Sequence, residues 1–443
     1  MPIKVGMVSL GCSKNLVDSE RMLSKLRKHG YELVTEPGLA DIAVVNTCGF
    51  IQSAKEEAIE TVLELGKLKK EGTLKKIVLT GCLTERYKEE AAELFPEADA
   101  VIGIGNNKDI TDVLDHVLAN ERYVDFAPKL EAELTGARII STLPFFAYLK
   151  VAEGCSNACT YCAIPRIRGK YRSVPIEECI AEARKLAENG VSELIVIAQD
   201  TSRYGEDIYG ESRLPQLLRE LCKIDGLRWI RTLYCYPERI TDELLETIAS
   251  EPKLVKYMEI PIQHCCSDIL SRMNRWGDEQ QLEALFAHIR EKVPGVVLRT
   301  TLITGFPGET EEQFTQLAEF IGRVRFDRLG CFAYSREEGT RSYSFPDQLD
   351  ESVKEHRADI IMEQQMLISA ECNEQQLGRE FEAVVEGFDR FGECWFGRTF
   401  RDAPDIDGKV FFTSDKPLKT GDYVKIKITD TLDYDLIGEV INE

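Results

Sequence analysis

The 443-residue sequence has no long apolar run and no excess of positive charge. No stretch approaches the ~18 uncharged apolar residues of a membrane-spanning helix, and the apolar run near the N-terminus is too short for a signal-peptide core. We therefore expect a cytoplasmic protein that does not enter a membrane. The 55 Lys and Arg against 76 Asp and Glu give a net charge of −21. This balance argues against a broad electrostatic grip on nucleic acid and favours a basic protein partner.

Histidine is also scarce, and of five scattered histidines only His264 lies at the end of a predicted strand. No Ser, His and Asp residues form a recognisable nucleophilic triad. The sequence therefore identifies no general acid or base, and the catalytic residues are unknown. Cysteine, in contrast, occurs 14 times. Thiols of a cytoplasmic protein stay reduced. A patterned subset of these cysteines therefore indicates metal binding or catalysis rather than disulfides.

Strand and helix patterns alternate along most of the chain, which predicts an α/β fold with parallel sheets. The first 120 residues contain such units, and residues 121–140 show no clear period and are predicted to be a linker. Six further βα units begin at residue 146 and predict a barrel or partial barrel. After a long predicted helix over residues 351–376, short strands separated by turns predict a small all-β barrel. The six predicted strands of the central region are 146–152, 193–198, 228–234, 257–262, 296–303 and 328–334.

Three cysteines lie close together just after a predicted strand. Cys155, Cys159 and Cys162, the loop triad, have C-x3-C-x2-C spacing. Three thiolates from one short loop can hold three irons of a 4Fe–4S cluster and leave the fourth iron open to a substrate. Two alternatives are a zinc site, which would normally recruit a fourth ligand, and cysteines that pack as small hydrophobic side chains.

The loop triad, with Tyr161 directly before its last cysteine and six βα units, resembles the radical S-adenosylmethionine (SAM) superfamily. The resemblance implies that the open iron binds SAM and that an electron from the cluster releases a 5′-deoxyadenosyl radical. It also implies SAM contacts at strand ends, and the residues that match are Tyr161, Gln199, Gln263 and Arg299. Residues 305–309, Gly-Phe-Pro-Gly-Glu, follow the fifth strand of this region. Each of these weaker matches is also explained by ordinary turn chemistry.

A second set of cysteines is dispersed along the first domain. Cys12, Cys48 and Cys82, the strand-end triad, each follow a predicted strand. The carboxyl ends of parallel strands lie at one edge of a sheet, so three loops can bring these thiols together there. The alternative is that they are buried cysteines at strand ends.

With both triads, the chain resembles the radical SAM methylthiotransferases over nearly its whole length. The resemblance implies a methylthiotransferase N-terminal domain (1–120), a linker (121–140), a radical SAM (β/α)6 partial barrel (141–374) and an all-β TRAM barrel (375–443). It also implies two 4Fe–4S clusters and two SAM molecules per turnover. One SAM methylates a sulfur on the strand-end cluster, and the second yields the radical that activates an unreactive carbon. An external electron donor is also implied.

Several segments are similar to the RimO-type branch, which acts on the β-carbon of an aspartate in small-subunit ribosomal protein twelve. They are AIPRIRGKYRSVP, PIQHCCSDILSRMNR, RLGCFAYSREEGT and DAPDIDGKV. The adjacent Cys265 and Cys266 depart from the expected single cysteine and receive no role. We expect a monomer that does not act on tRNA.

The charge of the C-terminal barrel agrees with a protein substrate. From residue 376 onward there are nine Lys and Arg against fifteen Asp and Glu. An RNA-binding barrel should be basic or carry aromatic platforms with cations, whereas an acidic barrel can steer a basic ribosomal protein. We expect Asp402, Asp405 and Asp407 to be exposed for this purpose. The alternatives are a merely solubilising surface, a MiaB-like tRNA methylthiotransferase, another RNA-binding protein and a simple iron–sulfur electron carrier.

Overall fold

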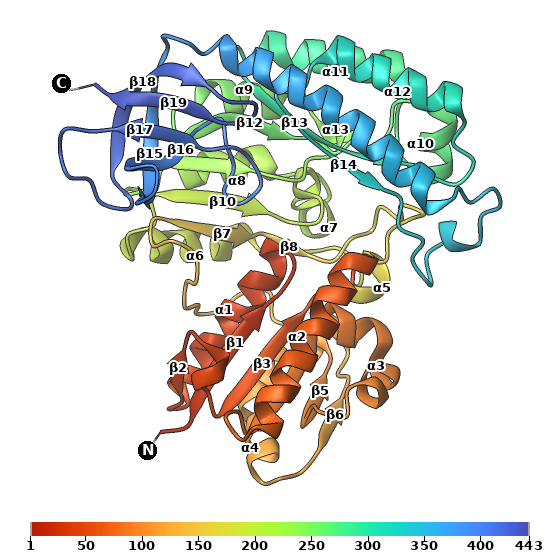
Figure 1. Ribbon diagram of the computed structural model, residues 1–443, viewed down its shortest axis with the longest axis vertical. Helices are drawn as coiled ribbons and strands as arrows, with labels where there is room; N and C mark the ends of the chain where they lie inside the picture. The colour runs from red at the N-terminus through yellow and green to blue at the C-terminus, as the bar shows by residue number, and fades with distance from the viewer. Residues whose placement is uncertain (1, 442–443) are drawn as a thin grey trace.

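The computed structural model describes residues 2–441, which form three domains (Figure 1). The first contains a six-stranded parallel sheet with the order β2-β1-β3-β4-β5-β6. Its strands are β1 (Lys4–Ser9), β2 (Glu32–Val34), β3 (Ile42–Thr47), β4 (Lys76–Gly81), β5 (Ala100–Ile102) and β6 (Tyr123–Asp125). The three-residue β6 lies within the segment predicted to be a linker. A strand this short carries no detectable alternation of apolar residues, so the sequence pattern did not reveal it.

Helices cover both faces of this sheet because its central strands are apolar on both sides. Ile42 and Val44 of β3 face one core, whereas Ala43 and Val45 face the other. Helices α1 and α4 pack on the first face, and α2 and α3 pack on the second. Their bounds are α1 (Ser13–Lys28), α2 (Gln52–Lys70), α3 (Cys82–Leu94) and α4 (Ile110–Leu118). This doubly covered parallel sheet places the loops after β1, β3 and β4 along one edge.

The central domain is an open six-stranded parallel sheet with the order β14-β13-β12-β11-β10-β7. The predicted partial barrel is therefore confirmed, and each predicted strand overlaps an observed one. The strands are β7 (Phe146–Lys150), β10 (Glu193–Ile197), β11 (Trp229–Thr232), β12 (Leu254–Glu259), β13 (Val297–Thr304) and β14 (Arg328–Ala333). The major helices are α6 (Ile176–Glu188), α8 (Leu214–Cys222), α9 (Asp242–Ser250), α11 (Glu279–Lys292), α12 (Glu311–Val324) and α13 (Glu351–Glu374).

Smaller elements decorate the loops of the central domain. A two-stranded antiparallel ribbon of β8 (Ala152–Glu153) and β9 (Arg172–Ser173) flanks the loop that carries the loop triad. The short helices are α5 (Ile164–Arg168), α7 (Glu206–Tyr209) and α10 (Ser267–Met273). Of these, α5 begins two residues after Cys162 and therefore continues directly from the cysteine loop.

The third domain is a closed five-stranded barrel with the order β15-β16-β17-β19-β18. Its strands are β15 (Glu380–Asp389), β16 (Cys394–Thr399), β17 (Val410–Thr413), β18 (Tyr423–Thr431) and β19 (Leu436–Val440). The barrel packs against the amino-terminal end of the central sheet, where Val384 and Ala403 join a core with Ile195 and Tyr257. The first domain lies along the β7 side of the central sheet (Figure 1), where α1 packs on β7 and where Lys55 and Arg86 pair with Glu337 in the loop after β14.

The expectation that Asp402 and Asp407 are exposed is wrong. Asp402 is 1% exposed and pairs with Arg328 at 2.6 Å. Asp407 accepts a hydrogen bond from the Tyr257 hydroxyl at 2.6 Å and pairs with Arg299 at 3.2 Å. Only Asp405 lies at the surface. The turn that holds these acids is inserted into the central domain, so their charges stabilise a domain interface rather than attract a partner.

Candidate functional site

The loop triad lies at the carboxyl end of β7 in a loop held by backbone hydrogen bonds. The Cys155 N–H donates to the Gly169 carbonyl at 3.0 Å, and the Cys162 N–H donates to the Cys159 carbonyl at 3.1 Å. Gly154 adopts a φ of +75°, and a Cβ there would lie 2.4 Å from the Lys170 carbonyl oxygen. The loop therefore requires glycine before its first cysteine, and its backbone fixes where the three thiols point.

The thiols of this triad are buried beside cationic and aromatic groups. The Cys159 sulfur lies 3.7 Å from the Tyr236 hydroxyl and 4.0 Å from Nη1 of Arg275. The Arg275 guanidinium also covers the Tyr236 ring, 4.1 Å from its centroid. Burial raises the pKa of Cys155 to about 11 and raises the pKa of Cys162. Metal binding at this loop must therefore displace protons, and Arg275 supplies positive charge that favours the thiolates.

The strand-end triad is brought together at the carboxyl edge of the first sheet. Cys12 precedes α1, Cys48 follows β3, and Cys82 begins α3. Because β1, β3 and β4 are neighbours in the sheet, these three loops are adjacent. A Cβ at Gly11 would lie 2.8 Å from the Cys48 sulfur, and one at Gly49 would lie 2.6 Å from Leu83. The glycines thus allow the three loops to approach each other closely.

Two buried cations lie beside the strand-end triad, and sequence reasoning missed both. Lys14, from the first turn of α1, points its ammonium at the Tyr234 ring, 3.0 Å from the centroid. Burial lowers the pKa of Lys14 to about 8, although the Cys12 thiolate opposes that shift. Arg168, from α5 of the central domain, reaches the neighbourhood of Cys82 and Cys12. A cation from another domain beside dispersed cysteines leaves no signature in sequence spacing.

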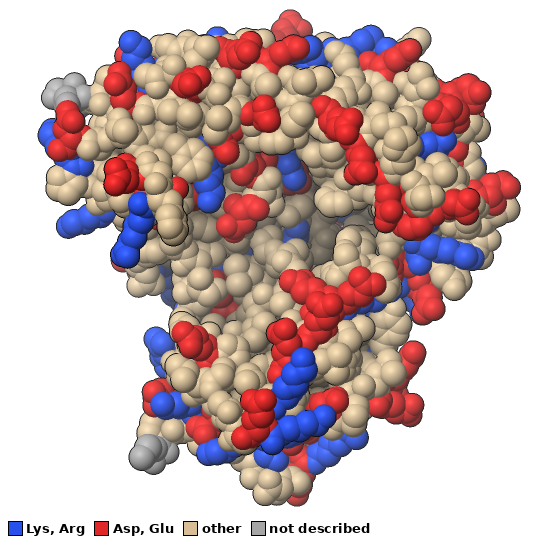
Figure 2. Space-filling model, viewed as in Figure 1, with Lys and Arg blue, Asp and Glu red and all other residues tan. Residues whose placement is uncertain are grey.

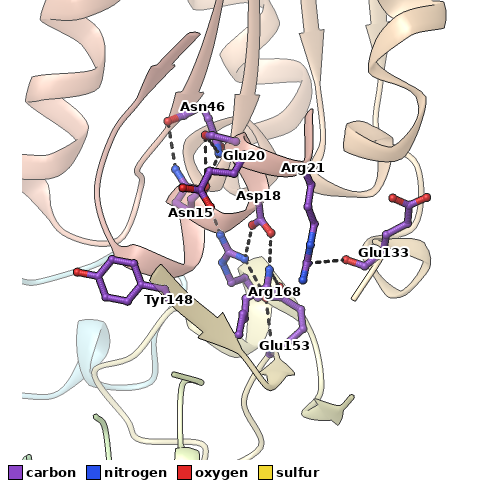
Figure 3. Close-up of polar contacts among 12 residues, drawn as sticks. Asn15, Asp18, Glu20, Arg21, Asn46, Glu133, Tyr148, Glu153 and Arg168 are labelled. Atoms are coloured by element: carbon purple, nitrogen blue, oxygen red, sulfur yellow. Dashed lines mark hydrogen bonds and ion pairs between the residues drawn. The ribbon is translucent and has the colours of Figure 1, made fainter. Parts of the chain in front are cut away.

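Arg168 also joins the two domains through buried ion pairs (Figure 3). Its Nη1 donates to Asp18 at 2.9 Å and to Glu153 at 2.8 Å, and its Nη2 donates to Asn15 at 3.1 Å. Lys150 pairs with the same two carboxylates. All four charged groups are buried. Removal of one partner would leave unpaired charge in the interface, so this network fixes how the first domain meets the cysteine loop.

The donor set of each triad fits an iron–sulfur cluster better than a single zinc ion. Among residues 2–441, one group of three Cys, His, Asp or Glu ligand atoms lies entirely within 4.8 Å, and it is His264, Cys265 and Cys266. A structural zinc ion normally takes four Cys or His ligands, whereas each triad offers three thiols. Three thiolates with positive charge beside them can hold three irons of a 4Fe–4S cluster.

The His264 group lies on the outer side of the central sheet. Cys265 and Cys266 belong to the core between the sheet and its covering helices. The Nδ1 atom of His264 accepts a hydrogen bond from the Cys266 N–H at 3.0 Å, and Nε2 lies 3.4 Å from a Glu309 oxygen. The Cys266 sulfur contacts Gln316 at 2.9 Å. These contacts hold the loop before α10 in place and do not reach either triad.

A cavity of about 770 Å³ is lined by residues from the loop after Cys48 and by Tyr161 of the loop triad's own loop. Phe50 and Ile51, which follow Cys48, line one side, while Tyr161, Gln263 and Thr301 line the other. The cavity is mostly apolar, and it is of the size that accommodates a small-molecule ligand. Its walls therefore come from the first and the central domain together.

The four residues expected to contact SAM lie in three different places. Tyr161 and Gln263 both line the cavity. Gln199 follows β10 and is half-buried. Arg299 lies deeper on the inner face of β13, where it pairs with Asp407 and lies 3.7 Å from Glu259. The structure thus brings Tyr161 and Gln263 together and places Arg299 at the contact with the third domain.

The fold and the two cysteine sites define a radical SAM protein with an additional domain on each side. Residues 149–321 match the model of the radical SAM superfamily, residues 4–103 match the one described as uncharacterized protein family UPF0004, and residues 377–441 match the TRAM domain. In solved structures the chain is similar to the radical SAM methyltransferase TsrM from Kitasatospora setae, with a TM-score of 0.57. That match has 14% identity and covers 86% of this chain and 79% of the other.

Curated relatives identify the family within this class. The protein named ribosomal protein uS12 methylthiotransferase RimO from Thermoanaerobacter sp. (strain X514) is 48% identical, over 98% of this chain and 99% of its own. The protein of the same name from Clostridium acetobutylicum is 47% identical, over 100% and 99%. The chain belongs to the RimO family of radical SAM methylthiotransferases. As the family implies, it uses a 4Fe–4S cluster and SAM.

Proposed function

We propose that this protein transfers a methylthio group to the β-carbon of an aspartate in ribosomal protein uS12. The observation that carries the proposal is one cavity bordered by the loops of both cysteine triads. A substrate side chain in that cavity would lie within reach of a radical source on one side and a sulfur donor on the other. The full-length similarity to proteins named for this activity supports the same reading.

In this proposal, Cys155, Cys159 and Cys162 hold the SAM-binding 4Fe–4S cluster, and Cys12, Cys48 and Cys82 hold a second one. When bound, the first cluster would supply the electron that cleaves SAM, and the second would accept or carry the sulfur that is methylated and inserted. Two SAM molecules are used in each turnover, one for the methyl group and one for the radical. Cysteine thiolates are the ligands that such clusters prefer.

The side chains around the clusters have binding and shielding tasks. Tyr161 and Gln263 are proposed to contact SAM from the cavity wall, with Gln199 beside them. Arg299 is proposed to act on SAM from a greater distance, because its guanidinium is already paired with Asp407. Arg275 and Lys14 balance the thiolate charge, and the apolar walls exclude water from the reactive carbon. Hydrogen abstraction by a carbon radical needs no general base.

The setting of the reaction also belongs to the proposal. The protein acts as a monomer in the cytoplasm, where its ribosomal substrate is made, and takes electrons from an external donor. Residues 1–120, 121–140, 141–374 and 375–443 serve as the N-terminal domain, linker, radical SAM core and TRAM barrel. No helix formed by residues 2–441 has the length and apolar character needed to cross a bilayer.

The test offers the reconstituted enzyme uS12 and unmodified tRNA in one reaction, with SAM and a reductant. We expect mass spectrometry to find a methylthio group on an aspartate of uS12 and none on the tRNA. Modification of the tRNA alone would refute the proposal and assign the chain to the MiaB-like alternative.

A further inference from the structure

Two acidic stripes flank the mouth of the cavity. The α13 stripe consists of Glu351, Glu355, Asp359 and Glu363, and the α2 stripe consists of Glu56, Glu60 and Glu64. Each stripe repeats every four residues, so its members lie on one face of their helix. All seven side chains are exposed. Figure 2 shows Asp and Glu side chains on both sides of the hollow between the first domain and the rest of the molecule.

The stripes meet the cavity at the amino-terminal ends of the two helices. Glu56 from α2 and Glu351 and Glu355 from α13 line the cavity itself. Like charges four residues apart destabilise a helix by about 0.2–0.5 kcal/mol per pair. Most of these acids also have no basic partner. Of the seven stripe acids, Glu351 alone forms an ion pair within residues 2–441, and its partner is Lys354. The stripes therefore leave a negative potential directed at the cavity mouth.

A second observation within the cavity points to a ligand. Gln263 is 8% exposed and lines the cavity, and none of the hydrogen bonds among residues 2–441 involves its side-chain amide. Its backbone has a φ of +73°, which an L-residue adopts only at a cost. A polar group that enters the cavity can pair with this amide.

We infer that a basic segment of the protein substrate lies between the α2 and α13 stripes and inserts the reacting side chain into the cavity, beside the SAM that Gln263 is proposed to contact. This inference rests on the proposed function and specifies where the substrate docks. Charge complementarity selects the partner, because a positively charged chain is attracted to both stripes at once. The barrel is the competing location. It presents fewer acids than its composition suggests, since Asp402 and Asp407 are paired within the domain interface.

Two charge-reversal variants with the same change in net charge distinguish the locations. The stripe variant carries Glu60→Lys, Glu64→Lys, Asp359→Lys and Glu363→Lys, none of which lines the cavity. The barrel variant carries Asp415→Lys, Asp430→Lys, Asp433→Lys and Glu439→Lys. All eight acids are exposed and have no ion-pair partner among residues 2–441. Circular dichroism and iron content verify that each variant folds and loads its clusters.

The measurements are the Kd for purified uS12 and the KM for uS12 in methylthio transfer, at ~0.1 M and ~1 M salt. We expect the stripe variant to raise both at least about tenfold at low salt and less at high salt, where the Debye length falls to ~3 Å. The barrel variant should bind like the wild type. A neutral variant (E60Q, E64Q, D359N and E363Q) should show a smaller loss and replaces the lysine variant if that one misfolds.

The outcomes separate the two claims. If the wild type modifies uS12 but the stripe variant keeps its Kd and KM, or the barrel variant loses as much, the docking inference is overturned and the proposed function stands. If the wild type neither binds nor modifies uS12, the proposed function fails, and the docking inference fails with it.

Discussion

The two cysteine triads of this protein are assembled in opposite ways. The loop triad takes its cysteines from eight consecutive residues, whereas the strand-end triad spans 71 residues and three loops. Local hydrogen bonds position the first, but only the order of strands β1, β3 and β4 positions the second. A dispersed site therefore exists only in the folded domain, and occupancy of that site must stabilise the domain.

Helix α5 connects the two sites. It begins just after Cys162, its Ile167 packs with Cys82, and its Arg168 lies beside the strand-end triad and pairs with Asp18. The loop proposed to form the radical and the site proposed to carry the sulfur are thus connected by one short helix. The comparison predicts that changes at one triad affect a different step of the reaction from changes at the other. Changes at α5 should instead affect how the first domain is held against the central domain.

The largest effect is expected from the loop triad. Replacement of Cys155, Cys159 and Cys162 with Ala should abolish SAM cleavage and methylthio transfer together, because the radical source is lost. Chromatographic detection of 5′-deoxyadenosine checks this. A Cys222→Ala, Cys331→Ala and Cys372→Ala variant is the control, since these cysteines lie in neither triad, and it should keep both activities. SAM cleavage retained in the loop variant would contradict the assignment.

The strand-end triad should show a selective loss. A Cys12→Ala, Cys48→Ala and Cys82→Ala variant should still form 5′-deoxyadenosine but transfer no methylthio group to uS12. The physical reason is that the loop triad is held by its own backbone contacts and does not need these thiols. Quantification of both products in one reaction measures the split. Methylthiolated uS12 from this variant would show that the site does not handle the sulfur.

Arg168→Met should destabilise the contact between the first and the central domain. It leaves Asp18 and Glu153 buried with less positive charge, a loss of about 3–5 kcal/mol for a broken buried pair. Urea unfolding of the cluster-free chain measures it. Arg219→Met, which removes an exposed pair with Glu243, should cost less than about 1 kcal/mol. An equal effect of the two variants would show that the network contributes little.

The smallest effect concerns pH at the contact with the barrel, away from both triads. Burial alone would raise the pKa of Glu193, but Arg398 and Arg231 outweigh burial and lower it below 4.5. A carboxylate with a lowered folded-state pKa contributes stability above its unfolded-state pKa, and this contribution is lost as pH falls through the folded-state value. The unfolding free energy of the wild type should therefore fall more steeply below about pH 4.5 than that of Glu193→Gln. Parallel curves would contradict this role.

The sequence predicted the fold well because its signals are local. Alternating strand and helix patterns located all six strands of the central sheet, and the C-x3-C-x2-C spacing located the loop triad. Prediction of the strand-end triad required one further inference, that the loops after parallel strands meet at one edge of the sheet. The structure brings the three loops that carry Cys12, Cys48 and Cys82 together as expected.

What the sequence could not predict depends on contacts between domains. Arg168 and Lys14 are ordinary basic residues in sequence, and only the packing of the domains places them beside the strand-end triad. The burial of Asp402 and Asp407 has the same cause, because acids in a turn are expected at the surface unless another domain covers them. The amino-acid composition includes the charges of Asp402 and Asp407, but it does not show that Arg328 and Arg299 pair with them.

The most direct test of the two-site account is the iron content of the reconstituted protein and of the two triple alanine variants, measured with Mössbauer spectroscopy. The account predicts about eight irons per chain in two 4Fe–4S clusters for the wild type and about four for each variant. A wild type with only about four irons, or a variant that loses all of them, would contradict the claim that the two triads hold separate clusters.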